Sequence, residues 1–155
     1  MSNRLPLTLL AVLGTLWLLS TAIADGKNAG QPELPRVLVK INEATLDVEL
    51  ATSSRQRYHG LSFRSALAEN EAMLFVYPSE KSLLFTMRNT SIPLSIAFID
   101  EDLVINEILD MQPFDDGPYP ARFASKYALE TNQGWFARND VKVGDRLSLE
   151  RGLIP

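Results

Sequence analysis

The chain has 155 residues, enough for one domain with a buried core. It contains no cysteine, which excludes disulfides, thiol chemistry and zinc–thiolate sites. Its 15 basic and 19 acidic residues give a net charge of −4. This mild acid excess argues against nucleic-acid backbones and anionic lipid as partners.

Residues 1–24 are typical of a secretory signal peptide. A basic residue precedes an apolar run from Leu5 to Leu19, and Ala22 and Ala24 supply the A-x-A cleavage pattern. Cleavage before Asp25 leaves 14 basic and 19 acidic residues, a net charge of −5. The alternative is an uncleaved membrane anchor, but the apolar run is shorter than the roughly 20 residues that span a bilayer. The sequence therefore predicts a periplasmic or secreted protein with no stable membrane span after cleavage.

The remaining chain reads as a flexible leader at 25–35 and a single domain over 36–155. Residues 36–41 are rich in β-formers, and 45–50 alternate between apolar and polar side chains, so the two runs predict a hairpin. Ser53 and Gln56 form a capping box, and Gly60 supplies a stop signal, for a short helix between them.

Further short strands follow from apolar runs and turn residues. The stretch 94–100 is apolar on both faces, which indicates an interior strand that is covered on both sides. The other strands are predicted at 73–77, where Pro78 stops the run, and at 83–87, 103–111, 127–130 and 147–149. A loop at 112–120 and a brief helix at 133–138 complete the chain. Because there is no βαβ rhythm, the expected fold is a compact, mainly antiparallel β-sandwich or barrel-like domain with two short helices.

A series of short motifs runs in order through residues 37–149. They are Arg57, Gly60-Leu61, Arg64, Met73-Leu74-Phe75, Phe85 to Thr90, Ile92-Pro93-Leu94, Ile96 to Asp100, Ala128-Leu129-Glu130, Gly134-Trp135 and Lys142-Val143-Gly144-Asp145. In these motifs the chain resembles the domain of unknown function 192 family of bacteria and archaea. The resemblance implies a small β-sandwich or barrel-like domain, often behind a signal peptide, for which no activity is settled.

The chain departs from the family pattern at four positions. It has Thr86 in place of tryptophan, Ser95 in place of aspartate, Ser62 in place of methionine and Ala72 in place of glycine. The carboxylate missing at Ser95 removes a charge near the polar stretch at 88–90. If that aspartate does chemistry in the family, this chain is altered or inactive, whereas a structural aspartate can be replaced by a hydroxyl at modest cost.

Polar residues beside apolar strand ends are the candidates for a site. Arg88, Asn89 and Thr90 offer directional hydrogen-bond donors for an anionic or sugar-like ligand. Alternatively, they satisfy backbone groups in a tight connection. Glu130 lies in apolar surroundings, so it is either a general base with a raised pKa or the partner of Arg64 or Arg88.

We expect a non-enzymatic exported domain that binds a small polar ligand or a protein partner in the cell envelope. The expected groove gathers Arg64, Met87, Arg88, Asn89, Thr90, Glu130 and Trp135. One alternative is a hydrolase or transferase in which Glu130 is the base and Arg88 stabilises charge. Another is a purely structural or assembly factor. No pattern indicates a cofactor, and because His59 is the only histidine, a His-rich metal site is excluded.

Overall fold

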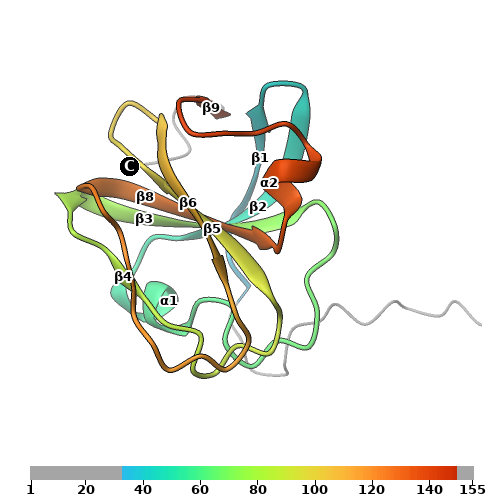
Figure 1. Ribbon diagram of the computed structural model, residues 1–155, viewed down its shortest axis with the longest axis vertical. Coiled ribbons are helices and arrows are strands. Elements are labelled where there is room, and N and C mark those ends of the chain that lie inside the picture. Colours follow the sequence, from blue (N-terminus) through green and yellow to red (C-terminus); the bar gives the residue numbers. More distant parts are fainter. Residues whose placement is uncertain (1–32, 150–155) are drawn as a thin grey trace, which may run out of the picture.

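A computed structural model describes residues 33–149, which form a curled seven-stranded sheet with both faces covered (Figure 1). The elements are β1 (Arg36–Ile41), β2 (Ala44–Ala51), α1 (Ser54–His59), β3 (Glu71–Lys81), β4 (Leu84–Phe85), β5 (Leu94–Ile99), β6 (Ile105–Met111), β7 (Tyr119–Pro120), β8 (Ser125–Asn132), α2 (Trp135–Arg138) and β9 (Leu147–Leu149). The strand order is β6-β5-β8-β3-β2-β1-β9, and β4 pairs with β7 in a separate two-stranded ribbon. The expected compact, mainly β fold with two short helices is confirmed.

The predicted signal peptide, and the predicted leader up to residue 32, lie outside the described residues. The last three leader residues, 33–35, are described and contact the domain. Leu34 packs against the core, and the carbonyl of Pro35 accepts a hydrogen bond from the Leu50 amide at 2.8 Å. The domain therefore begins slightly before the residue at which its first strand begins.

One pair of neighbouring strands is parallel. β2 and β3 run side by side in the register Leu50–Leu74, and they are joined by α1 and the irregular segment 60–70. The capping box predicted for α1 is confirmed, because the Gln56 amide donates to Ser53 Oγ at 3.2 Å and the Ser53 amide donates to Gln56 Oε1 at 2.8 Å. A helical crossover of this kind is what allows two consecutive strands to pair in parallel.

The largest differences between predicted and observed strand lengths are in β3, β8 and β4. β3 continues through Pro78 to Lys81. Its register to β8 shifts between Val76 and Lys81. Proline lacks the N–H needed for a ladder hydrogen bond, but the extended backbone continues beyond it. β8 extends over residues 125–132, since it pairs with β3 on one edge and β5 on the other. The predicted strand at 83–87 contributes only the two residues of β4.

Alternation along the strands divides the buried residues into two cores on opposite faces of the sheet. The first core contains Leu74 and Leu129, and the second contains Phe75 and Ala128. All six residues of β5 are buried, which confirms the predicted interior strand. Because Glu130 follows Leu129 in β8, its side chain faces the second core.

No helix within residues 33–149 could cross a membrane, since the longer of the two, α1, has six residues.

Candidate functional site

Two glutamates lie in one row across the second-core face of the sheet. The register places Glu49 of β2 beside Met73 of β3, Met73 beside Glu130 of β8, and Glu130 beside Ile96 of β5. Both glutamates are buried, Glu49 with 2% and Glu130 with 5% of its surface exposed. Burying a carboxylate is unfavourable unless it is paired or protonated.

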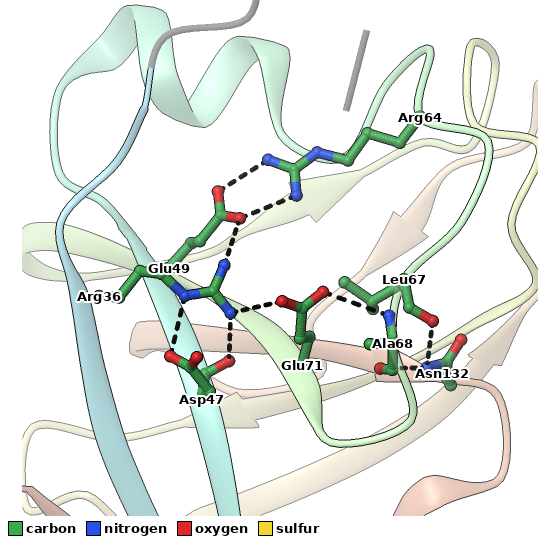
Figure 2. Close-up of polar contacts among 8 residues, drawn as sticks. All are labelled: Arg36, Asp47, Glu49, Arg64, Leu67, Ala68, Glu71 and Asn132. Atoms are coloured by element: carbon green, nitrogen blue, oxygen red, sulfur yellow. Dashed lines mark hydrogen bonds and ion pairs between the residues drawn. The ribbon is translucent and has the colours of Figure 1, made fainter. Parts of the chain in front are cut away.

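Glu49 is paired. Arg64 donates from both terminal nitrogens to its two oxygens, at 3.0 and 2.8 Å, and Arg36 donates to Oε1 at 3.0 Å. Figure 2 shows Arg36 between Glu49, Asp47 and Glu71, with Arg64 on the far side of Glu49. Such two-pronged arginine–carboxylate contacts are strong and geometrically specific. They fasten the segment that carries Arg64 to the face of β2.

Glu130 has no such partner. Its carboxyl group makes no hydrogen bond or ion pair with any residue in the described part of the chain. The two arginines expected as its partners are used elsewhere, Arg64 on Glu49 and Arg88 on Asp116 at 2.8 Å. Burial raises the pKa of Glu130 to about 8, and the charge of Arg64 opposes this only in part. The side chain is therefore mainly a neutral carboxylic acid at pH 7.

Glu130 faces the inner of two adjoining chambers that form a groove. The inner chamber has a volume of about 190 Å³ and the outer one about 580 Å³. They share lining residues from the end of α1 and from β4, including His59 and Phe85. The outer chamber falls in the range of known small-molecule sites, about 300–1,000 Å³, whereas the inner one would admit only part of such a ligand.

The structure brings four of the seven expected site residues to this groove. Thr90 and Glu130 line the inner chamber, and Arg88 and Asn89 line the outer chamber. The remaining three, Arg64, Met87 and Trp135, line neither chamber.

Met87 is buried in the second core, and Arg64 is buried against Glu49. Trp135 is a correction to the expected groove, because it belongs to the first core on the other face of the sheet, where its indole nitrogen donates to Asn70 Oδ1 at 3.2 Å. β8 ends at Asn132, and Gly134, with a φ of 77°, precedes α2, which packs Trp135 into the first core.

The backbone of the polar stretch 88–90 is held from two sides. The amide of Phe63 donates to the Asn89 carbonyl at 2.8 Å, and the amide of Phe114 donates to the Thr90 carbonyl at 3.0 Å. Both phenylalanines have positive φ, 63° and 58°, which is unusual for bulky residues. Both side chains are nevertheless exposed, and Phe63 lines the outer chamber. Strained backbone of this kind tends to occur at functional sites.

The profile of DUF192, described as "Uncharacterized ACR", matches residues 37–149. The chain belongs to the DUF192 family. No curated protein matches it at a significant level.

Two solved structures are similar to this DUF192 domain. One is a protein from Sinorhizobium meliloti 1021 described as a candidate transcription regulator, with 31% sequence identity and a TM-score of 0.74, covering 77% of this chain and 98% of that one. The other is a protein of unknown function from Novosphingobium aromaticivorans DSM 12444, with 34% identity and a TM-score of 0.71, covering 74% of this chain and 86% of that one.

The departures from the DUF192 pattern fall on both faces of the sheet. Ser62 and Thr86, each smaller than the family's residue, line both chambers of the groove. Ser95 is on the opposite face from Glu130, where it donates to Asp110 Oδ1 and accepts from the Gly134 amide at 2.8 Å. The carboxylate that Ser95 lacks would therefore not have faced the groove.

Sequence reasoning missed several groove residues. His59 and Tyr58 end α1, Tyr77 belongs to β3, and all three line the inner chamber. Tyr58 is the most exposed large hydrophobic side chain described, at 89%. The sequence feature that could have indicated them is Tyr58 beside the only histidine, His59, at the end of a predicted helix; the structure shows that this helix buries no residue.

No group of three histidine, aspartate or glutamate side chains suited to a metal ion occurs among residues 33–149. In the acidic turn after β5, Asp100 Oδ1 accepts hydrogen bonds from the amides of Asp102 and Val104, at 3.0 and 2.9 Å. This carboxylate closes the hairpin.

Proposed function

We propose that this DUF192 domain binds a small polar ligand in the two-chambered groove, with Glu130 at its inner end. The observation that carries the proposal is Glu130, whose side chain is buried and makes no hydrogen bond to any described residue, while its carboxyl oxygens are not fully enclosed and so face the inner chamber. Buried polar groups are nearly always satisfied. Glu49, on the same face, shows the internal pairing that a purely structural role would give. Glu130 instead faces space that a ligand can enter.

A hydrolase or transferase is the second candidate, and the raised pKa of Glu130 favours it. With a pKa of about 8 the carboxyl is mostly protonated at neutral pH, so it would serve first as a general acid. Arg88 lies in the outer chamber and is tied to Asp116, which separates it from Glu130. Turnover of a ligand that binds in the groove, lost in Glu130→Gln, would establish this candidate over simple binding.

Macromolecular partners have weaker support. The description of the Sinorhizobium protein suggests DNA, but the acid excess of this chain opposes approach to a phosphate backbone. The exposed side chains of Tyr58, Phe63 and Leu84 around the outer chamber would also fit an envelope protein. The unpartnered Glu130 is too deep for a flat protein surface to reach, and this is why we prefer a small ligand.

The ligand proposal predicts a thermal shift that depends on the groove. In a library of envelope metabolites, a ligand present at 100 times its Kd stabilises the native state by about 2.7 kcal/mol, or on the order of 10 °C. Thr86→Trp should abolish that shift, because Thr86 lines both chambers and the larger side chain would obstruct the space where they meet. The measurement is the thermal midpoint of the chain from Asp25 onward, with and without each compound.

Leu38→Trp is the matched control, since Leu38 is an exposed residue of β1 that lines neither chamber. It should leave the shift intact. A shift that survives Thr86→Trp would place binding elsewhere on the domain and contradict the proposal.

The same proposal includes export of the chain. Expressed from its full sequence, the protein should appear in the periplasm or medium with Asp25 as its first residue, as N-terminal sequencing of fractionated cells would show. Ala24→Trp should leave the precursor uncut because signal cleavage needs a small residue at that position. Gly26→Trp, beyond the cut, should be processed normally. Full-length chain in the cytoplasmic fraction would refute export.

A further inference from the structure

Four polar side chains converge on the inner chamber from four separate parts of the fold. They are His59 of α1, Tyr77 of β3, Thr90 of the stretch before β5 and Glu130 of β8. None of the four makes a side-chain hydrogen bond within residues 33–149, and none carries a fully enclosed unsatisfied polar atom, so their polar groups are accessible. Two of them, Thr90 and Glu130, are buried, and buried polar side chains in a purely structural role are normally hydrogen-bonded within the protein.

These four groups are similar in their hydrogen-bonding chemistry. A carboxylic acid, a phenol and a hydroxyl can each both donate and accept a hydrogen bond, and an imidazole offers two ring nitrogens for hydrogen bonding. Burial raises the pKa of Glu130 to about 8, and burial also raises the pKa of Tyr77 against the opposing charge of Arg57, so both remain protonated at neutral pH. A ligand hydroxyl also donates and accepts, whereas an ammonium group only donates and a carboxylate or phosphate only accepts.

The cations around the chamber are already bound to protein groups. Arg57 donates to the carbonyls of Thr52 and Val76, and Arg64 is paired with Glu49. Their positive charges remain and would repel a cationic ligand. The charge of Arg64 reaches the chamber, since it acts to lower the pKa of Glu130. Most of their N–H donors are already bound to protein acceptors and are therefore not available to an anionic ligand. The inner chamber is thus best suited to an uncharged ligand.

The walls of the groove add a second requirement. Tyr58 and Phe63 expose their rings at the outer chamber, and Phe85 lines both chambers. Aromatic rings offer flat apolar surfaces, which match the C–H face of a saturated sugar ring. Phe63, which has a positive φ, thus presents an exposed ring to the outer chamber.

We propose that the ligand is a neutral, polyhydroxylated ring of the sugar class, whose hydroxyl groups reach His59, Tyr77, Thr90 and Glu130 in the inner chamber while its C–H face lies on the aromatic wall. This inference rests on the proposed function and specifies its ligand class. Glu130 recognises the ring as a carboxylic acid that donates one hydrogen bond and accepts another.

The test measures binding at pH 6.5, by saturation-transfer NMR and titration calorimetry, to three panels of probes. These are neutral methyl pyranosides with disaccharides, primary amines, and small carboxylates with phosphates. We expect binding within the neutral sugar panel. Glu130→Gln, whose amide also donates and accepts, should change that affinity by less than about tenfold, whereas Glu130→Leu should lower it by at least about tenfold.

The aromatic wall is tested by Tyr58→Ala, which is safe for folding because Tyr58 is almost fully exposed. It should weaken binding of pyranosides several-fold and leave binding of an acyclic polyol such as sorbitol unchanged. Arg55→Ala, at another exposed position of α1 that lines neither chamber, is the control.

The outcomes separate the two proposals. If amines bind to wild type but not to Glu130→Gln, which cannot carry a negative charge, the groove is a ligand site but the sugar class is wrong. The same holds if anions bind in a way that Thr86→Trp blocks. If no probe of any panel binds, both proposals are overturned.

Discussion

Replacing Glu49 by leucine should lower the free energy of unfolding by about 3–5 kcal/mol, the range measured when one partner of a buried ion pair is removed. Glu49 and Arg64 are both almost completely buried, and two hydrogen bonds of 2.8–3.0 Å join them. The substitution keeps the volume of the side chain but removes the carboxylate that compensates the guanidinium. Urea denaturation of wild type and variant at pH 7 measures the difference.

A double-mutant cycle separates pairing from packing. Glu49→Leu and Arg64→Met together should be less destabilising than the sum of the two single substitutions, because no buried charge of the pair then remains. Glu69→Leu is the control, since Glu69 forms an exposed pair with Arg138, a class of pair that contributes about 0–1 kcal/mol. An equal loss for Glu49→Leu and Glu69→Leu would show that the buried pair has no special weight.

The same pair bears on the groove. Arg64 directly follows Phe63 and is two residues from Ser62, and these two residues line the outer chamber. The Asn132 amide holds the other end of the segment through the carbonyls of Leu67 and Ala68, at 3.0 and 2.9 Å (Figure 2). The ion pair therefore fixes one wall of the groove to the sheet.

Glu130→Gln should remove a large pH dependence of stability. In the unfolded chain the Glu130 carboxyl loses its proton near its ordinary pKa of 4.5, but in the folded domain it does so only near 8. Between these values the folded state binds more protons, so the free energy of unfolding of the wild type falls as the pH rises. Each pH unit inside the window contributes up to about 1.4 kcal/mol, and below 4.5 or above 8 this group contributes no slope.

The glutamine variant lacks this titration, so its stability should exceed that of wild type by a growing margin from pH 5 to pH 8, reaching a few kcal/mol. The charged or titratable groups near Glu130 are Arg64, which opposes its pKa shift, and Arg57, His59 and Tyr77 in the chamber wall. They are present in both proteins, so the difference between the two curves isolates Glu130. Parallel curves would mean that Glu130 is ionised in the folded domain.

A control substitution distinguishes this effect from a general response to lost charge. Glu43 lies in the turn of the β1–β2 hairpin with its side chain exposed. Glu43→Gln should leave the slope of stability against pH as it is in wild type. Urea denaturation at four pH values between 5 and 8 covers the whole comparison.

The sequence by itself determined the local structure of this domain. The alternation at 45–50 gave the strand β2 its two faces, and Ser53 with Gln56 set the start of α1. The apolar residues on both faces of 94–100 indicated a strand covered on each side, which β5 is. These features depend on neighbours a few residues apart, and so their physical causes are present in any short stretch of the chain.

Only the tertiary structure decided which side chains meet. Arg64 could have paired with either buried glutamate, and the course of the segment between α1 and β3 places it on Glu49. Trp135, five residues after Glu130, lies on the other face of the sheet. The chamber gathers His59, Tyr77 and Glu130 from three elements. Their proximity follows from strand order and register, which are set by contacts between distant segments, and no local spacing encodes them.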